Sequence, residues 1–126
     1  MIPETRAAIY NVGKNITGLT GGFFYLIAPS LTVSPYAVFS QISNPFTQDT
    51  VNDFEDVYFQ INIYSLSAAE AGTLFEAAKK LFDNAEAQLT TVNYSAIRIQ
   101  RQLTRESVLD KTFMNTIQYR LQLQKK

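Results

Sequence analysis

The strongest folding signal in this chain is a change of hydrophobic period between residues 54 and 82. From Phe54 to Ser65 apolar and polar side chains alternate, which predicts a strand with one buried and one outward-facing side. After Ser65 the apolar residues recur at every third or fourth position, as they do along one face of a helix. Because the strand runs directly into the helix, we expect the helix to pack on the apolar face of a sheet.

The helix has a clear start, because Ser67 is followed three residues later by Glu70. This is the capping-box spacing, in which the serine hydroxyl and the glutamate carboxylate satisfy two backbone N–H groups reciprocally. The predicted buried stripe of the helix is Ala71, Leu74, Phe75, Ala78, Leu81, Phe82 and Ala85. The predicted buried side of the preceding strand is Val57, Phe59, Ile61 and Ile63. These two stripes predict the two sides of one core.

The residues before this pair predict a helix followed by two strands. Apolar residues from Ile2 to Leu19 share one helical face, Pro3 suits the first helical position, and Gly13 is a possible interruption. The pair Gly21-Gly22 breaks the helix. We then expect a short strand at Phe23 to Ile27, a loop at Ser30 to Pro35, a strand at Tyr36 to Ser43 and a long loop at Asn44 to Asp53.

The residues after the second helix predict two further strands joined by a charged loop. The first is Val92 to Leu103, with Ile97, Ile99 and Leu103 inward and Arg101 interrupting that pattern. The loop is Thr104 to Lys111. The last strand is Thr112 to Gln124, whose predicted inward residues are Phe113, Ile117, Tyr119, Leu121 and Leu123.

These elements predict an α+β fold in the order α-β-β-β-α-β-β. We expect an antiparallel sheet of about four main strands with two helices packed on one face, and residues 1–126 forming a single domain. No apolar stretch is long enough to span a membrane, and the start of the chain lacks the pattern of a signal peptide. We therefore expect no membrane partner and synthesis in the cytosol.

The composition narrows the chemistry that is open to this chain. It contains no His and no Cys, which excludes imidazole bases, cysteine nucleophiles, disulfides and the commonest transition-metal ligands. An enzyme of this composition is limited to carboxylate or lysine chemistry. We expect no enzyme, no catalytic residues, no cofactor and no metal. Charged residues make up only 17% of the chain and 46% is hydrophobic, which suits a subunit that works in an assembly.

Two local patterns resemble binding sites, and we expect neither to be one. Asp53, Glu55 and Asp56 are candidate ligands for a hard cation, but Glu55 and Asp56 are neighbours on a strand and point to opposite faces. Gly21-Gly22 resembles a phosphate-binding loop, but the lysine and the following helix of such loops are missing. A solvated loop end and a plain turn are the expected structures.

The charges are divided unevenly along the chain although eleven basic residues balance eleven acidic ones. Residues 1–96 hold four basic and nine acidic residues, and residues 97–126 hold seven basic and two acidic ones, giving balances of minus five and plus five. The basic end could contact nucleic acid, but the aromatic side chains needed for base stacking lie on the predicted inward face. Complementary contacts between neighbouring copies or partner proteins are the preferred interpretation, and no specific nucleic-acid binding is expected.

The outward side of the predicted sheet is polar but carries few charges. A free antiparallel face usually carries more Lys and Glu, so this composition favours a protein contact surface or the lining of a ring over an ordinary wet face. The predicted outward residues are Tyr58, Gln60, Asn62, Tyr64, Gln100, Gln102, Gln118, Gln122 and Gln124.

Several segments together carry a resemblance to a known family. They are a helix leading to Leu19 through Tyr25, then Ala28-Pro29, then Ser34 through Phe39, the strand Phe59 to Ser65 running into the helix Ala68 to Phe82, and two closing strands. In this order and spacing the chain resembles the tail-terminator, or tail-completion, family of long-tailed bacteriophages over nearly its whole length.

The resemblance implies a structural protein that forms a ring, usually a hexamer, at the head-proximal end of the tail. Such a ring caps the finished tube, stops tube-subunit addition at the tape-measure length and presents a surface to the head connector. The implied partners are further copies of the chain, the tail tube protein and the head completion protein. The implied location is the virion tail, with assembly in the host cytoplasm.

Combined with the charge pattern, this suggests acidic and basic residues on opposite sides of the ring contacts. The candidate contact residues are Asp49, Asp53, Glu55, Asp56, Arg98, Arg101, Arg105 and Arg120. Three alternatives stay open: a head-side neck protein of the same virion, an enzyme using carboxylate or lysine chemistry, and a nucleic-acid-binding module.

Overall fold

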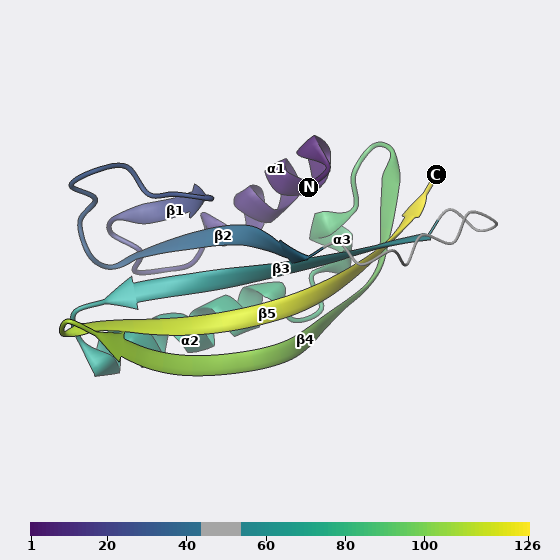
Figure 1. The fold of residues 1–126 in the computed structure, drawn as a ribbon. Helices are drawn as coiled ribbons and strands as arrows, with labels where there is room; N and C mark the ends of the chain where they lie inside the picture. The colour runs from purple at the N-terminus through teal and green to yellow at the C-terminus, as the bar shows by residue number, and fades with distance from the viewer. Residues whose placement is uncertain (44–53) are drawn as a thin grey trace.

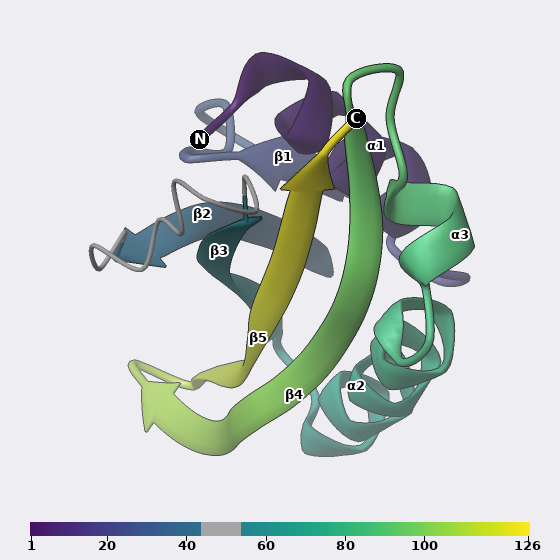
Figure 2. The same ribbon diagram turned by 90° about the vertical axis from the view of Figure 1, so that its right-hand side faces the viewer.

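The computed structural model describes residues 1–43 and 54–126, which form one five-stranded sheet with three helices on one side (Figures 1 and 2). The strand order in the sheet is β1-β2-β3-β5-β4. The elements in chain order are α1 (Pro3–Gly13), β1 (Gly22–Tyr25), β2 (Tyr36–Ser43), β3 (Phe54–Ser65), α2 (Ala68–Phe82), α3 (Glu86–Leu89), β4 (Tyr94–Leu109) and β5 (Thr112–Lys125). None of the described helices has the length and hydropathy needed to cross a membrane.

The α+β class and the order of the elements are confirmed, with two additions. The four long strands β2, β3, β5 and β4 pair antiparallel with one another, whereas β1 pairs parallel with β2, so the whole sheet is mixed. The short helix α3 was not predicted, because its four residues are too few to show a period. The predicted loop at Asn44 to Asp53 lies outside the described residues.

The core lies between the helices and one face of the sheet, as the two apolar stripes predict. The inward residues of β3 are buried, and so are Ile117, Tyr119, Leu121 and Leu123 of β5. The Phe82 ring of α2 lies 6.1 Å from Phe59 and 5.7 Å from Tyr119, measured between ring centroids. Aromatic side chains from helix and sheet therefore hold the two layers together.

The start of α2 shows how closely the local sequence sets the structure. Ser67 Oγ accepts a hydrogen bond from the Glu70 N–H at 3.3 Å, as the capping box predicts. The returning contact runs through a third residue: the Ser67 N–H donates to Ser65 Oγ at 3.1 Å, and the Ser65 hydroxyl donates to Glu70 Oε1 at 2.7 Å. Buried Ser65 thus joins the end of β3 to the first turn of α2.

At the other end of the core, Gly13 is the last residue of α1 instead of an interruption within it. A Cβ atom at Gly13 would lie 2.2 Å from the Phe23 ring of β1, so only glycine permits this close approach. Ile9, Val12 and Ile16 are buried in the same core, as the helical pattern predicts.

The predicted loop at Thr104 to Lys111 is wrong, because β4 continues as a strand to Leu109. The turn consists of Asp110 and Lys111, whose positive φ angles of 48° and 67° suit a two-residue hairpin. Charged residues fit this part of β4 because the strand forms an edge of the sheet and is exposed from Arg101 to Glu106.

Two inward assignments on β4 are also wrong. Register shifts between Ala96 and Arg98 and between Arg101 and Leu103 change which side chains face the helices. Ile97 and Leu103 are therefore exposed, at 46% and 47%, whereas Ile99 stays in the core at 8%. Sequence alternation assumes a regular strand, and a bulge inverts the pattern after it.

Candidate assembly surfaces

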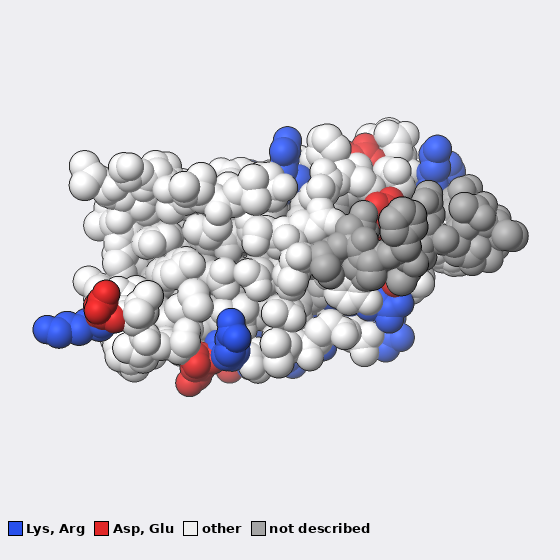
Figure 3. All heavy atoms as spheres, in the orientation of Figure 1, with Lys and Arg blue, Asp and Glu red and all other residues white. Residues whose placement is uncertain are grey.

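The outer face of the sheet is polar and mostly uncharged, as predicted; the register places Asp56, Arg98, Arg105 and Arg120 on it. In the strand register Tyr64 lies between Tyr36 and Met114, and Gln60 lies between Ser40 and Gln118. Figure 3 shows this face: uncharged atoms cover its middle, and Lys, Arg, Asp and Glu gather around its margins. Of the predicted outward residues, Gln102 departs from the pattern because it lies at the second register shift of β4.

Side chains on this face are already ordered by contacts within the subunit. The Thr116 hydroxyl donates to Asn62 Oδ1 at 2.7 Å, joining β5 to β3. The rings of Tyr36 and Tyr64 stack with centroids 4.9 Å apart. Burial, with a smaller contribution from Tyr36, raises the pKa of the Tyr64 phenol. The face is thus a preorganised surface of amides, hydroxyls and phenols.

Two of the predicted contact residues pair with each other within the subunit. Arg120 Nη2 of β5 lies 2.8 Å from Asp56 Oδ2 of β3, and Asp56 is only 5% exposed. The hydrogen bond to Asp56 raises the pKa of the Arg120 guanidinium. Each charge is therefore compensated before any neighbour arrives. The prediction that Glu55 and Asp56 point to opposite faces of the sheet is confirmed. In the strand register Asp56 pairs with outward Gln122, and Glu55 pairs with inward Leu123.

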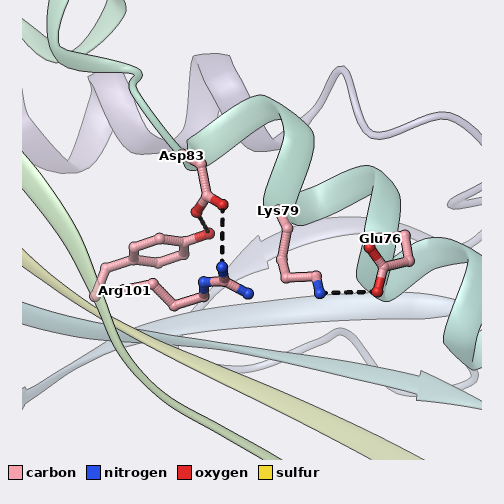
Figure 4. A network of polar contacts seen from close by, with 5 residues as sticks. Glu76, Lys79, Asp83 and Arg101 are labelled. Atoms are coloured by element: carbon pink, nitrogen blue, oxygen red, sulfur yellow. Dashed lines mark hydrogen bonds and ion pairs between the residues drawn. The ribbon is translucent and has the colours of Figure 1, made fainter.

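A third predicted residue, Arg101, contacts the helix layer. Its Nη2 lies 3.5 Å from Asp83 Oδ2 at the end of α2, while the Tyr119 hydroxyl donates to Asp83 Oδ1 at 2.9 Å (Figure 4). Burial, followed by this hydrogen bond, raises the pKa of the Tyr119 phenol. Beside this network Lys79 and Glu76 of α2 pair at 2.8 Å. The network ties β4 and β5 to the end of α2.

Three further candidates, Arg98, Arg105 and Glu55, have no such internal partner in the described part of the chain. Within residues 1–43 and 54–126, no carboxylate lies within ion-pair distance of Arg98 or Arg105, and no cation lies within that distance of Glu55. Asp49 and Asp53 lie outside the described residues. The same described ranges contain no group of three acidic residues that could hold a metal ion.

A groove of about 310 Å³ opens between the start of α2 and the hairpin end of β4 and β5. We call it the hairpin groove. Its apolar lining is Ala68, Ala71, Val108 and Phe113, and its polar lining includes Glu106 and Asn115. Asn115 is only 4% exposed.

The free edge of β4 is closed along its first half only. The Ala96 N–H donates to Thr90 Oγ1 at 3.1 Å, and the Ile99 N–H donates to Glu86 Oε1 at 3.2 Å. Residues 90 and 86 belong to the α3 region, which covers this half of the edge. From residue 102 to 109 the described structure shows no side-chain cap of this kind. The hairpin groove lies beside this uncapped half.

Residues 26–33, which we call the apolar segment, lead from β1 back to β2 and expose large apolar side chains. Their exposed fractions are 62% for Leu26, 78% for Ile27, 99% for Leu31 and 65% for Val33. The Gly21 N–H donates to the Pro35 carbonyl at 2.8 Å, and a Cβ atom at Gly21 would lie 1.8 Å from the Val33 carbonyl oxygen. Gly21 is thus a close-packed anchor of the segment.

Sequence reasoning missed both the apolar segment and the hairpin groove. A signal for the segment was present, since the chain carries no charge between Lys14 and Asp49 while Leu26, Ile27 and Leu31 fall in a region of weak periodicity. No such signal exists for the groove, because its lining comes from α2, β4 and β5.

Comparisons with known proteins agree with the resemblance. A family model described as "Tail completion protein gp17" matches residues 12–123. Among solved structures, a chain of the "Virion of native gene transfer agent (GTA) particle" has a TM-score of 0.79 and 12% identity, over 94% of this chain and 93% of that chain. At that identity the likeness concerns the fold. No protein of the curated collection matches the chain.

Proposed function

The chain belongs to the tail completion protein gp17 family, and from this premise we propose that its copies form a ring that caps the tail tube and joins it to the head connector. The family gives the chain a structural tail-completion role. The observation that carries the ring proposal is that the sheet ends in two unlike edges, the short parallel strand β1 and the long strand β4. Unlike edges suit head-to-tail contacts, which form a ring when the rotation between neighbours closes.

The outer face supports this proposal through its composition. A ring that caps a tube needs a face that contacts the tube or lines the channel, and a charge-poor polar face suits either task. The proposed partners are further copies of the chain, usually six in all, together with the tail tube protein and the head completion protein. The proposed location is the head-proximal end of the virion tail, after assembly in the host cytoplasm.

Charged side chains are proposed to contribute to the ring contacts as well. Arg98 and Arg105 are exposed and have no internal ion pair in the described structure, so they are the strongest basic candidates for a contact with Asp49, Asp53 or Glu55 of a neighbour. Asp56 and Arg120 already neutralise each other and would enter such a contact as a pair.

Electron microscopy of tail tubes assembled with and without this protein tests the function. We expect tubes of uniform length with a ring at one end when the protein is present, and continued tube growth when it is absent. The native mass of the purified protein, measured by light scattering, gives the ring size. A ring that binds the head connector but never binds tubes would contradict the proposal and indicate a neck protein.

A further inference from the structure

We infer that the apolar segment of one copy docks into the hairpin groove of the next copy and forms the main apolar contact between ring neighbours. This inference rests on the proposed ring and adds the surfaces that build it. The occupant of the groove is therefore a second copy of this chain.

The apolar segment has the chemistry of a buried contact but lies on the surface. Leu31 is 99% exposed and Ile27 78%, whereas side chains of this type gain free energy when they leave water. The segment is also held in place at both ends, because the Gly21 N–H bonds to Pro35 and the Leu26 N–H bonds to the Phe39 carbonyl at 2.9 Å. A preordered segment loses little conformational entropy when it docks.

The hairpin groove offers a matching receptor. Ala68, Ala71, Val108 and Phe113 give it apolar walls, and about 310 Å³ is enough for branched aliphatic side chains. Asn115 lines the groove, and its side-chain amide can bond the backbone of an arriving segment. The adjacent half of the β4 edge also lacks the caps that close its first half.

The position of the two surfaces excludes a contact within one subunit. The segment follows β1, and the groove is lined by residues of α2, β4 and β5. The strands β1 and β4 form the two opposite edges of the sheet, as Figure 1 shows. With strands about 4.8 Å apart, the four intervals from β1 to β4 span about 19 Å. Both surfaces lie at the same end of the strands, where Tyr36, Ser65 and the β4–β5 turn meet in the register. Repeating one such contact forms a ring when the rotation from copy to copy closes.

Charge complementarity points the same way. In residues 1–43 the charged side chains are Glu4, Arg6 and Lys14. Glu4 accepts hydrogen bonds from the neutral side chains of Thr91 and Asn93 and keeps its charge, so with the exposed Arg6 and Lys14 the side chains of residues 1–43 carry a net charge of plus one. The charged residue that lines the hairpin groove is Glu106, which has no ion pair among the described residues. The net positive charge of the part of the chain that carries the apolar segment thus suits a groove lined by a carboxylate.

Thiol cross-linking tests the contact, because the chain contains no Cys and any thiols are those introduced. The variants are Leu31→Cys and Val108→Cys, with Val92→Cys as a matched control because Val92 is 84% exposed and lies outside both surfaces. A flexible bis-maleimide linker is added to the oligomer and, in parallel, to capped tubes. We expect covalent dimers when L31C and V108C proteins are mixed and a ladder of larger species from the double variant. V92C with V108C should give none.

The outcomes separate this inference from the proposed function. Rings or capped tubes that form without an L31C–V108C cross-link would overturn the contact and leave the function standing. Strong self-cross-linking of L31C alone would also overturn it, because it indicates a two-fold contact. Cross-linked rings that do not cap tubes would contradict the function and keep the contact. If the protein neither oligomerises nor caps tubes, both proposals fail.

A second variant pair checks the energetic part of the inference. Leu31→Asp should weaken association about tenfold or more while leaving the melting temperature unchanged, because Leu31 makes no buried contact in the subunit. Val92→Asp should change neither quantity. Sedimentation velocity at matched concentrations measures the loss, and equal association of L31D and wild type would contradict the docking.

Discussion

The two halves of β4 pair with the same strand, β5, yet they stand in opposite relations to the rest of the subunit. In the first half Ile99 is buried, Arg101 reaches Asp83 of α2, and two edge N–H groups are capped by the α3 region. In the second half both faces are exposed, the edge has no such caps within the described residues, and the hairpin groove opens beside it. One strand therefore contributes to the core at one end and is left open at the other, where we propose the contact between copies.

The largest expected difference between the two halves is in the free energy of unfolding when one side chain of each half is shortened to alanine. Ile99→Ala should lower the free energy of unfolding by about 2–4 kcal/mol, because Ile99 is in the core and its loss leaves a cavity. Val108→Ala should change it by no more than about 0.5 kcal/mol, because Val108 is 60% exposed. Urea denaturation of the two variants, kept below the oligomerisation concentration, measures both. Equal losses would remove the distinction between the halves.

The network that fixes the first half to α2 should show a smaller effect with a particular pH dependence. Tyr119→Phe should cost about 1 kcal/mol at neutral pH by removing the hydrogen bond to Asp83. The folded pKa of Tyr119 is raised, so its contribution is complete below the unfolded value of about 10 and is lost as the pH rises above it.

Above about pH 10 the free energy of unfolding of wild type should therefore fall by up to about 1.4 kcal/mol more per pH unit than that of Y119F. Denaturation curves measured at intervals from about pH 8 to about pH 11 test this difference in the free energy of unfolding. Identical slopes for the two proteins would show that Tyr119 ionises equally in the folded and unfolded states.

The smallest effect on folding is expected from opening the capped edge. Glu86→Ala removes the acceptor of the Ile99 N–H and should cost about 0.5–1 kcal/mol, whereas Glu86→Gln keeps an acceptor oxygen and should cost less. The part of the β4 edge that Glu86→Ala opens should also promote non-specific association, because free strand edges pair with other chains. Light scattering of both variants over time measures this, and an E86A protein as monodisperse as E86Q would contradict the role of the cap.

Much of the fold could be predicted because its signals are local. The alternation in β3, the helical stripe of α2 and the cap at Ser67 each depend on residues within one element, and the structure confirms them. The errors occur where the structure of a segment depends on the neighbouring strand. The bulges of β4 exposed Ile97 and Leu103, and the edge position of β4 turned a predicted loop into a strand.

The candidate contacts divide in the same way. The uneven charge and the charge-poor sheet face are sequence properties, and the face is present in the structure. That Asp56 pairs with Arg120, and Arg101 with Asp83, depends on which strands and helices become neighbours. The hairpin groove likewise combines residues 68 and 71 with residues 106–115, which sequence spacing does not bring together.

By itself the sequence determined the class of fold, the order of its elements, the absence of imidazole and thiol chemistry, and membership of a tail-completion family. The fold class, the element order and the missing chemistry follow from composition and short-range periodicity, which act before any long-range contact forms. The family follows from the match of residues 12–123 to its model. Only the tertiary structure decided which charges are neutralised inside the subunit, which half of β4 is closed, and where an exposed apolar segment and an open groove lie. The physical reason is that burial and strand edges are properties of neighbours in space, and a bulge or a strand order can reverse what one segment indicates.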